Sequence, residues 1–521
     1  MKKNDYLLLV ATGAYSLLFY QQNTGINFLL FNIVLLVVLI LKNVNLLKNK
    51  KWIWSALMCL VSAVAIFVHS SALSIIANVA SLLLLSAVSF NVATSSLFSF
   101  AFSCYSVASC LVYIAIDSIK RLQPKTDVPS SKKNHKVIAT AGVLLLSILF
   151  FNMYKSSNPL FAENTKWINF DFISFNWICF TISGFILSYA FFYHRTITPI
   201  ETWENNLLLI NTETIQDEQN QKRFETERYA GLLLFVLLNV MLVVLNIGDI
   251  QTLYFNGGLP KNVTHSDFVH SGVGIIILSI IIATSLMMYL FRSEFTSTKN
   301  NKALMAFAYL WIIQNVLMLS STAFRNQIYI HDFNFTYKRI GVYVWLVLAA
   351  FGLCVLFYKI YKKQTNWYLI RTNVALWFSV LVVSSTLNWD KLITNYNIQN
   401  KPLSQVDFGY LFSLSDTNLP ELLAVAKTPR FKRIYNLEKT LLERYRTELN
   451  SLNTTTSYRE NKRYRELETL ISQHDNLFLY GDSYTTRLNI KINHYLSDYT
   501  NDWRSFDLRD QEITKSIYLK N

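Results

Sequence analysis

The stretch Gly231-Leu-Leu-Leu-Phe-Val-Leu-Leu-Asn-Val-Met-Leu-Val-Val-Leu245 decides the fold, because its fifteen consecutive residues carry no charge. A helix of this composition has no polar face to present to water, so lipid or other helices must surround it. About 20 apolar residues are needed to cross the hydrocarbon core of a bilayer as a helix. Comparable runs recur along the chain and stop after residue 387. The sequence therefore predicts a protein that crosses the membrane many times.

Twelve apolar runs have a length close to that of a membrane span. They lie near residues 6–20, 26–41, 52–69, 72–90, 96–116, 137–154, 173–193, 230–250, 270–291, 303–324, 340–361 and 372–387. Hydrophobic residues make up 52% of the chain and charged residues 16%, against about 25% charged in an average soluble domain. We predict an all-α polytopic membrane protein with 11–12 transmembrane helices and a small, mainly helical, soluble C-terminal domain.

Composition divides the chain into four segments. They are an N-terminal transmembrane block at residues 1–193, a polar connecting segment at 194–229, a second transmembrane block at 230–387 and a soluble domain at 388–521. We call the last segment the C-terminal domain. It is long enough to bury a small core of its own.

Helical periodicity runs through much of the C-terminal domain. It is found at residues 411–426, with Pro420 in the first turn of a helix, and again at 435–449 and 464–471. In contrast, Phe478–Tyr480 and then Leu488, Ile490 and Ile492 look strand-like or irregular. We expect a mainly helical domain with one irregular part.

The distribution of basic residues predicts the orientation in the membrane. The net charge is +15, and the C-terminal domain accounts for only +2 of it, so the excess lies in short loops between apolar runs. Twelve strict crossings leave the two sides almost balanced, whereas eleven crossings give 23 basic residues on one side and 6 on the other. Because Lys and Arg stay cytoplasmic, the second arrangement is favoured. It places the N-terminus in the cytoplasm and the C-terminal domain outside, in a bacterial cytoplasmic (inner) membrane, with residues 71–96 as the segment that does not cross.

No motif for catalysis or for binding a cofactor or a metal is present. The chain has no phosphate-binding lysine loop, no nucleophile elbow and no dinucleotide fingerprint. His265 and His270 have the wrong spacing for a pair of ligands on one helical face, so a helix start near Ser266 or Asp267 is favoured. The excess charge is spread over membrane loops, which argues against nucleic-acid binding. We expect a protein that is not an enzyme and needs no cofactor.

The five cysteines, Cys59, Cys104, Cys110, Cys179 and Cys354, all fall in apolar runs, where a free thiol packs as a small hydrophobe. Ionisable residues inside a membrane would point to function, and this chain has few of them. Those at the ends of apolar runs are Asp117, Glu227, Asp249 and Arg325, of which Asp249 is the deepest.

Four uncharged polar residues lie well inside the runs, namely Asn239, Asn246, Gln314 and Asn315. Hydrogen bonds between helices account for them. A cavity lined by the first three would instead favour transport.

Several short segments, taken in order, resemble a bacterial membrane-protein family known only as a domain of unknown function, the related 4153 and 4173 groups. The segments are residues 23–28, 157–162, 254–258, 264–272, 325–330, 333–339, 388–398, 407–411, 414–416 and 502–507. Asn158 stands where the family usually has an acid, and the arginine pair of the family is missing near His270. The resemblance implies the architecture and no activity.

The better-matched residues supply our candidate functional positions: Asp249, Arg325, Tyr329, Arg339, Asn388 and Asp390. Arg325 and Arg339 bracket a connection that contains Tyr329, which suits an anchor at the membrane surface or a site for an anion. Residues 388–398 are expected to leave the last span as an amphipathic surface turn, with Trp389 and Tyr396 at the depth of the lipid headgroups.

Two classes of function remain open. The first is a non-enzymatic scaffold or sensor subunit of a membrane complex, which binds a protein partner through residues 388–521. Few intramembrane charges and the sizeable aromatic-rich C-terminal domain favour it. The alternative is a transporter or permease component for an uncharged or lipidic substrate, which needs no intramembrane charge. In both cases membrane lipids surround the chain.

Overall fold

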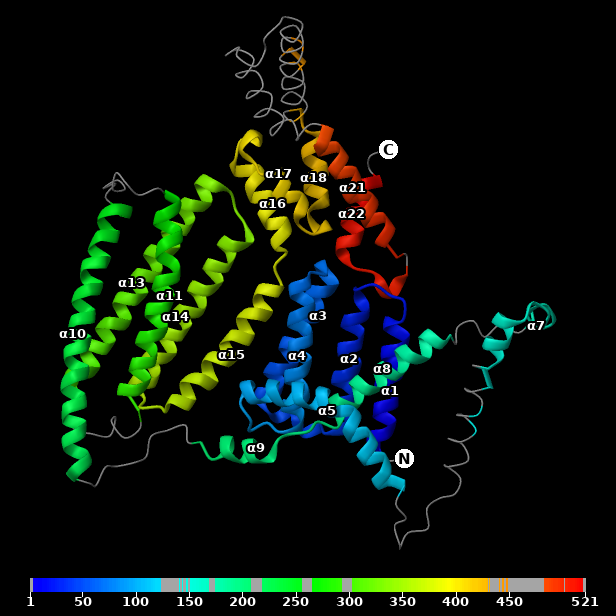
Figure 1. The fold of residues 1–521 in the computed structure, drawn as a ribbon, viewed down its shortest axis with the longest axis horizontal. Coiled ribbons are helices and arrows are strands. Elements are labelled where there is room, and N and C mark those ends of the chain that lie inside the picture. The colour runs from blue at the N-terminus through cyan, green and yellow to red at the C-terminus, as the bar shows by residue number, and fades with distance from the viewer. Residues whose placement is uncertain are drawn as a thin grey trace, which may run out of the picture. The chain divides into compact units, whose positions relative to one another are not determined.

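The computed structural model describes residues 3–122, 151–167, 174–207, 218–254, 265–292, 302–429, 482–500 and 502–518, with single residues between 140 and 150 and between 431 and 447. Within these ranges every regular element is a helix (Figure 1). The predicted helices at 435–449 and 464–471, and the apolar run at 137–154, lie largely outside the described residues. The all-α prediction is confirmed.

Eight described helices are long and apolar enough to cross a membrane. They include α10 (Glu218–Tyr254), which contains the uncharged run 231–245. Two shorter apolar segments, Ile26–Lys42 and Leu278–Leu290, accompany them. The chain is therefore a multi-pass membrane protein.

The helices form two compact units, and each is described by itself. Unit 1 comprises residues 1–207, 381–386 and 500–507, and unit 2 comprises residues 208–380, 387–499 and 508–521. The helices of unit 1 are α1 (Lys3–Phe19), α2 (Ile26–Lys42), η1 (Val44–Lys48), α3 (Lys50–His69), α4 (Ala72–Phe90), α5 (Ser96–Leu122), α7 (Pro159–Asn164), α8 (Phe175–Phe192), α9 (Thr198–Asn205) and η4 (Trp503–Ser505).

Short polar caps set the turns of unit 1. Asn49 accepts hydrogen bonds from the first backbone N–H groups of α3, and Ser71 accepts one at the start of α4. Between them Ser70 adopts a left-handed conformation, with φ of 43°, so that α3 and α4 fold back on each other. The segment predicted not to cross, residues 71–96, contains the uninterrupted 19-residue helix α4, which is long and apolar enough to span.

A buried polar cluster joins three helices of unit 1. Asn32 of α2 and Asn78 of α4 bond through their amides at 3.2 Å. Asn78 also donates to Ser62 Oγ at 3.0 Å, and the Cys59 thiol donates to Asn32 Oδ1 at 2.7 Å. All four side chains are completely buried. Because hydrocarbon offers no competing partner, such amide bonds hold spanning helices in register.

Residues 500–507 pack against the connection between α1 and α2. Ile26 N donates to the backbone oxygen of Phe506 at 2.8 Å. Gly25 lies so close to the same backbone segment that a Cβ atom there would be 2.5 Å from the backbone oxygen of Ser505. Only a glycine permits this approach of two backbones.

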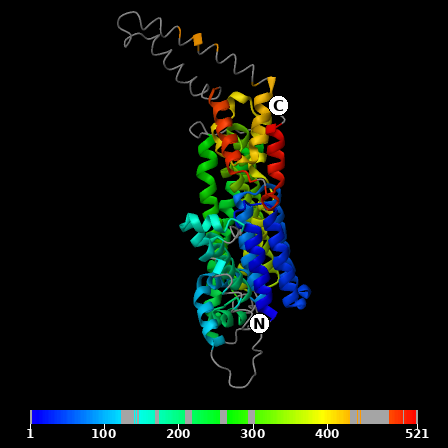
Figure 2. The same ribbon diagram turned by 90° about the vertical axis from the view of Figure 1, so that its right-hand side faces the viewer.

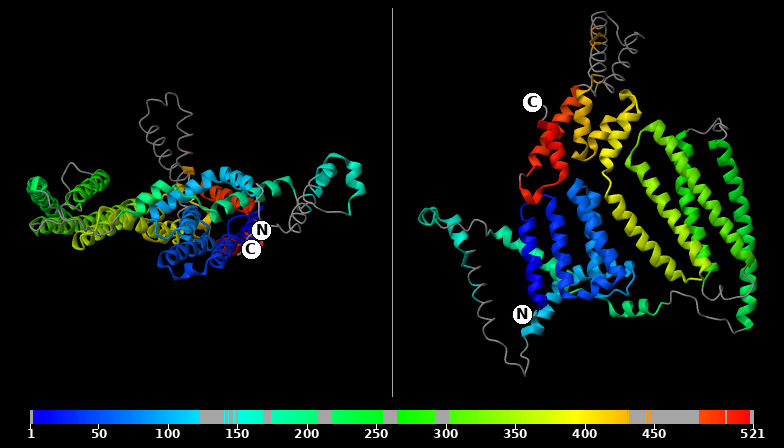
Figure 3. Two further views of the ribbon diagram at one scale, coloured as in Figure 1. Left: turned by 90° about the horizontal axis from the view of Figure 1, so that it is seen from below. Right: turned by 180° about the vertical axis from the view of Figure 1, so that it is seen from behind.

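Unit 2 holds the second set of long helices and most of the C-terminal domain. Its helices are α10, α11 (His265–Leu290), α13 (Lys302–Phe333), α14 (Tyr337–Tyr361), most of α15 (Asn366–Ser385), α16 (Trp389–Asn400), η2 (Leu403–Gln405), α17 (Phe408–Ser413), η3 (Asp416–Asn418), α18 (Leu419–Lys427), α21 (Asp482–Asp498) and α22 (Leu508–Tyr518). Helices α10, α11, α13 and α14 run alongside one another (Figures 1 and 3).

Interhelical hydrogen bonds involve three of the four polar residues predicted to make them, Asn239, Asn246 and Gln314, whereas Asn315 donates within α13 to the oxygen of Trp311 at 2.7 Å. Gln314 Nε2 donates to Asn239 Oδ1 at 2.6 Å, and Asn239 Nδ2 donates to the oxygen of Phe307 at 3.0 Å. Asn246 Nδ2 donates to the oxygen of Gln314 at 3.3 Å. These amides join the two helices.

The C-terminal domain is a small bundle in which α16, α18, α21 and α22 gather (Figures 1 and 2). Pro420 lies in the first turn of α18, as predicted. The strand-like expectation for residues 488–492 is wrong, because α21 continues through them as a helix. Tyr484, Leu488 and Ile492 recur every four residues and are buried, while Ile490 is 62% exposed.

The surface turn expected at residues 388–398 is also wrong, since these residues form helix α16. Trp389 packs against the core of the C-terminal domain rather than standing clear of it. The ring of Tyr396 lies 5.2 Å from that of Phe335. Both rings therefore pack within unit 2.

Candidate functional site

The candidate site lies where the α13–α14 connection meets the C-terminal domain in unit 2. Asn334 makes the turn with φ of 76°, a left-handed conformation that asparagine tolerates. The Asn397 side chain accepts from Phe335 N at 2.6 Å and donates to Phe335 O at 2.9 Å. Ile340 of α14 is part of the buried core of the C-terminal domain. The connection is thus bonded to the domain and packed into it.

A cavity of about 890 Å³ opens at this junction. The membrane helices and their connection contribute Asn326, Tyr329, Thr336, Tyr337, Lys338, Arg339 and Val342, and the C-terminal domain contributes Asp390, Tyr410, Ser413, Leu414 and Ser415. A ligand in this cavity would touch both parts of unit 2 at once.

The carboxylate of Asp390 is already satisfied by hydrogen-bond donors. Tyr337 donates its hydroxyl to Asp390 Oδ1 at 2.7 Å. Ser415 donates both its hydroxyl and its backbone N–H, the latter at 3.3 Å, to Asp390 Oδ2. Asp390 is only 7% exposed. Its charge is therefore spread over fixed donors and is poorly placed to neutralise a cation in the cavity.

Two cations of the cavity have no acidic partner among the described residues. The guanidinium of Arg339 stacks 4.3 Å from the centre of the Tyr329 ring, and its Nη1 donates to the oxygen of Phe333 at 2.7 Å. Lys338 is exposed at the cavity wall. Both lie in the first turn of α14, where the helix dipole also favours negative charge. The arrangement suits an anionic ligand.

Two further polar groups complete the wall of the cavity. Asn326 is 1% exposed and donates to the oxygen of Arg339 at 3.2 Å, while its Oδ1 has no partner. The Tyr410 hydroxyl accepts a hydrogen bond from Tyr337 N at 3.0 Å. Burial raises the pKa of Tyr410, so its hydroxyl keeps its proton at neutral pH. Tyr410 can therefore donate that proton to a bound oxygen.

Three of the six residues that the sequence singled out meet in this cavity: Tyr329, Arg339 and Asp390. Arg325 lies one helical turn before Tyr329 and forms an ion pair with Asp249 of α10. The exposed fractions of these two side chains are 12% and 8%. This pair ties α13 to α10.

Asn388 has a local structural role. Its Oδ1 caps α16 by accepting from Lys391 N at 3.1 Å, and Thr417 Oγ1 donates to the same atom at 3.2 Å. Asn388 therefore holds α16, with Asp390 in its first turn, in place beside the cavity.

Asn326, Tyr337, Tyr410 and Ser415 are wall residues that were not among our candidate positions. All four fall inside segments that carried the family resemblance, so a signal was present for them. The other end-of-helix charges also form ion pairs, Glu227 with Arg292 at 2.6 Å and Asp117 with Arg195 at 2.5 Å. No three His, Cys, Asp or Glu residues in the described part of the chain gather as metal ligands. The side chains of His265 and His270 lie outside that part.

Comparison with known proteins identifies a family. No curated protein and no solved structure matches the chain. The model of one family, domain of unknown function DUF4153, matches residues 7–425, which include both sets of long helices and the part of the C-terminal domain that lines the cavity. Because this match covers most of the 521 residues, the chain belongs to the DUF4153 family.

Proposed function

We propose that this protein is a non-enzymatic sensor or scaffold subunit of a bacterial cytoplasmic-membrane complex. It binds an anionic group in the cavity lined by Arg339, and it binds a protein partner through its C-terminal domain. The observation that carries the proposal is the composition of the cavity wall. Arg339 and Lys338 come from a membrane helix, and Tyr410 and Ser415 come from the C-terminal domain. An anion bound there would contact both the membrane helix and the C-terminal domain. Its binding would therefore act directly on the domain.

Electrostatics supports an anion over a neutral ligand. Asp390 is held by three donated hydrogen bonds, whereas Arg339 and Lys338 have no acidic partner among the described residues. Tyr410 adds a neutral donor. A phosphate or carboxylate would accept from the guanidinium fork and from these neighbours.

Phosphate binding tests the anion site. Thermal unfolding of the purified full-length chain is measured in detergent with inorganic phosphate or with chloride at equal ionic strength. We expect phosphate to raise the unfolding midpoint of the wild type and of Lys427→Gln, a matched control at the exposed end of α18, but not that of Arg339→Gln. Equal shifts in all three proteins, or no shift in the wild type, would refute the anion site.

The partner surface is proposed on the C-terminal domain, where Ile490 of α21 is 62% exposed on a face away from the buried stripe of Tyr484, Leu488 and Ile492. Ile490→Lys should lose a companion protein that copurifies with the wild type at a fixed ratio, whereas Lys427→Gln should keep it. Retention of the companion by Ile490→Lys would place the partner elsewhere, and no companion with any variant would contradict a scaffold.

The proposed orientation has the N-terminus in the cytoplasm and the C-terminal domain outside it. The positive-inside count supports it, because eleven crossings put 23 basic residues on one side and 6 on the other.

The alternative of a transporter for an uncharged or lipidic substrate was tied to a cavity lined by Asn239, Asn246 and Gln314. The amide nitrogens of these residues donate to one another and to backbone oxygens between α10 and α13, while Asn246 Oδ1 and Gln314 Oε1 are buried without a partner among the described residues. The engaged nitrogens support the sensor or scaffold over the transporter, because a polar path needs donors that are free to meet a solute.

A further inference from the structure

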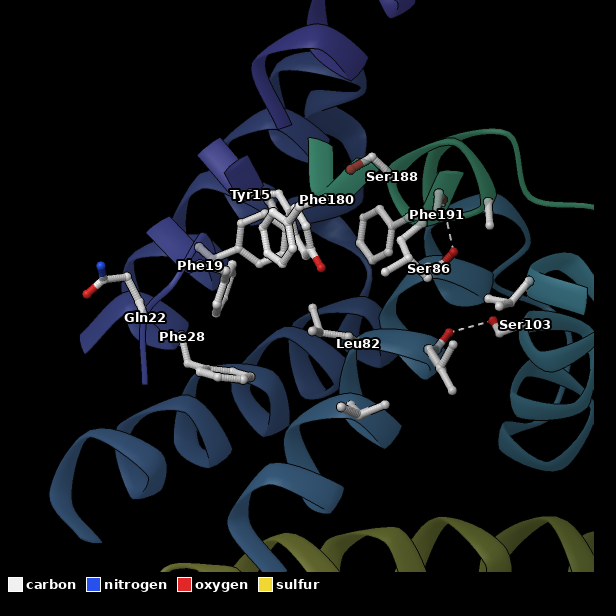
Figure 4. Close-up of a pocket in the computed structure, with 17 residues that line it drawn as sticks. Tyr15, Phe19, Gln22, Phe28, Leu82, Ser86, Ser103, Phe180, Ser188 and Phe191 are labelled. Atoms are coloured by element: carbon white, nitrogen blue, oxygen red, sulfur yellow. Dashed lines mark hydrogen bonds between the residues drawn. The ribbon is translucent and has the colours of Figure 1, made fainter. Parts of the chain in front are cut away.

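Unit 1 contains a second cavity, of about 440 Å³, that the anion site does not use. Helices α1, α2, α4, α5 and α8 surround it. Aromatic rings make up much of its wall, and Figure 4 shows Tyr15, Phe19, Phe28, Phe180 and Phe191 directed towards the same space. Its size lies within the range of about 300–1,000 Å³ that is usual for small-molecule sites.

One glycine shapes the wall at α8. Gly184 lies against Tyr15 of α1, and a Cβ atom at this position would be 2.2 Å from Tyr15 Cδ1. The missing side chain lets the Tyr15 ring lie flat against α8, where it stacks on Phe180 at a centroid distance of 4.8 Å. The stacked rings of Tyr15 and Phe180 are part of the cavity wall. Gly184 therefore sets the shape of this wall.

Two of the hydroxyl groups in the wall, those of Ser86 and Ser103, are bonded to backbone oxygens. Ser86 donates its hydroxyl to the oxygen of Phe191 at 2.9 Å, and Ser103 donates to the oxygen of Leu83 at 2.6 Å (Figure 4). No charged residue is among the described residues that line the cavity. The wall therefore presents mainly hydrocarbon surface, with the hydroxyl groups of Ser86 and Ser103 turned to the backbone.

The rim shows what surrounds the opening. Val79 of α4, Val107 of α5 and Leu187 of α8 line the cavity and are 47%, 39% and 47% exposed. All three belong to helices that are long and apolar enough to span the membrane, where an exposed apolar side chain meets lipid chains. Gln22 lies in the connection between α1 and α2. In Figure 4 this polar residue is at the end of the cavity opposite Ser103.

We propose that this cavity binds the acyl chain of a membrane lipid, which enters between α4, α5 and α8. The chain would lie along the rings of Phe19, Phe28 and Phe191. A charged ligand is excluded, because no charged residue among the described residues of the wall would replace the water that such a ligand loses. A hydrocarbon chain gives up no hydrogen bonds on entry and gains close contact with the aromatic rings. The inference stands independently of the anion site.

Photolabelling tests it. The full-length chain is reconstituted in vesicles of a phospholipid with a diazirine in its acyl chain, irradiated, and digested for mass spectrometry. We expect labelled residues in the cavity wall as well as on the exposed faces. Leu82→Trp, which fills the cavity from α4, should lose the wall labels, whereas Ile76→Trp, at a 59% exposed position of the same helix, should keep them.

A second variant guards against misfolding of Leu82→Trp. Val79→Phe narrows the rim at an exposed position, and it should reduce the wall labels while the helical circular dichroism and the elution volume stay those of the wild type. Labels confined to the exposed faces of the wild type would overturn the proposal. Wall labels that persist in both filled variants would also overturn it.

Discussion

Tyr337 donates its hydroxyl to Asp390 at 2.7 Å, and this one hydrogen bond joins the first turn of α14 to the first turn of α16. The residues are 53 positions apart in the chain. One begins a long apolar helix and the other begins the C-terminal domain. This hydrogen bond therefore helps to attach the C-terminal domain to the membrane helices. The proposed sensor requires that attachment.

Removing this bond should loosen the domain in a graded way. We expect Tyr337→Phe to lower the stability of the domain by about 1 kcal/mol, the net value of one hydrogen bond. Asp390→Ala should cost more, because it also strands the two donors of Ser415. Proteolysis of the C-terminal domain in the full-length protein measures the difference. An Asp390→Ala protein that resists protease as well as the wild type would contradict the role given to Asp390.

The ion pair of Asp249 and Arg325 should behave as a unit. Arg325→Leu leaves the carboxylate of Asp249 buried without its partner, which costs about 3–5 kcal/mol for a buried pair. The double variant Asp249→Leu/Arg325→Leu removes both charges and should recover most of that loss. Thermal unfolding of the four proteins in detergent completes the cycle. Losses that simply add would show that the two charges do not interact.

Two glycines offer a matched comparison in unit 1. Gly25→Ala places a methyl group 2.5 Å from the backbone oxygen of Ser505, which cannot swing aside as a side chain would, so residues 500–507 should detach. Gly13→Ala meets nothing within 4 Å in the middle of α1 and should preserve or slightly raise stability. Cysteines at positions 23 and 505 would report detachment through a lost disulfide. Equal cross-linking in both variants would count against the close packing at Gly25.

Unit 1 should weaken in acid through His194. Its ring is 4% exposed, both ring nitrogens lack partners, and burial lowers its pKa to about 4. The folded state therefore binds fewer protons than the unfolded state, whose histidine has a pKa near 6.5. Stability should be full above pH 6.5 and should fall by about 3 kcal/mol as the pH drops to 4.

The control for this pH dependence is His194→Phe, which keeps a ring beside Phe90 but cannot titrate. Unfolding midpoints of the wild type and the variant are compared between pH 7 and pH 4. The two curves should diverge as the pH falls below 6.5. Parallel curves would mean that another group governs the acid response.

Reporter fusions test the orientation. A reporter that is active only in the cytoplasm should be silent when fused after Asn521 and active when fused before Met1, because the positive-inside count predicts that the two ends lie on opposite sides. Cytoplasmic activity at Asn521 would favour an even number of crossings and would overturn the eleven-span arrangement.

The sequence alone determined the class of fold and many local features. The uncharged run 231–245 had to be a helix surrounded by lipid or protein, and it lies in α10. Pro420 had to stand in a first turn, and it does in α18. The prediction at residues 488–492 was wrong because it assumed the two-residue period of a strand. Leu488 and Ile492 were read as alternating positions of a strand, although with Tyr484 they mark a four-residue helical stripe.

The tertiary structure alone decided which distant groups meet. Asp249 pairs with Arg325 across 76 residues, and Gly25 meets Ser505 across the length of the chain. Helix formation depends on contacts three or four residues apart, which a single sequence displays. The pairing of helices depends on complementary shapes and buried charges that many arrangements of similar apolar runs would offer, so no local pattern encodes it. Tyr337, Tyr410 and Arg339 therefore become one cavity only in the folded chain.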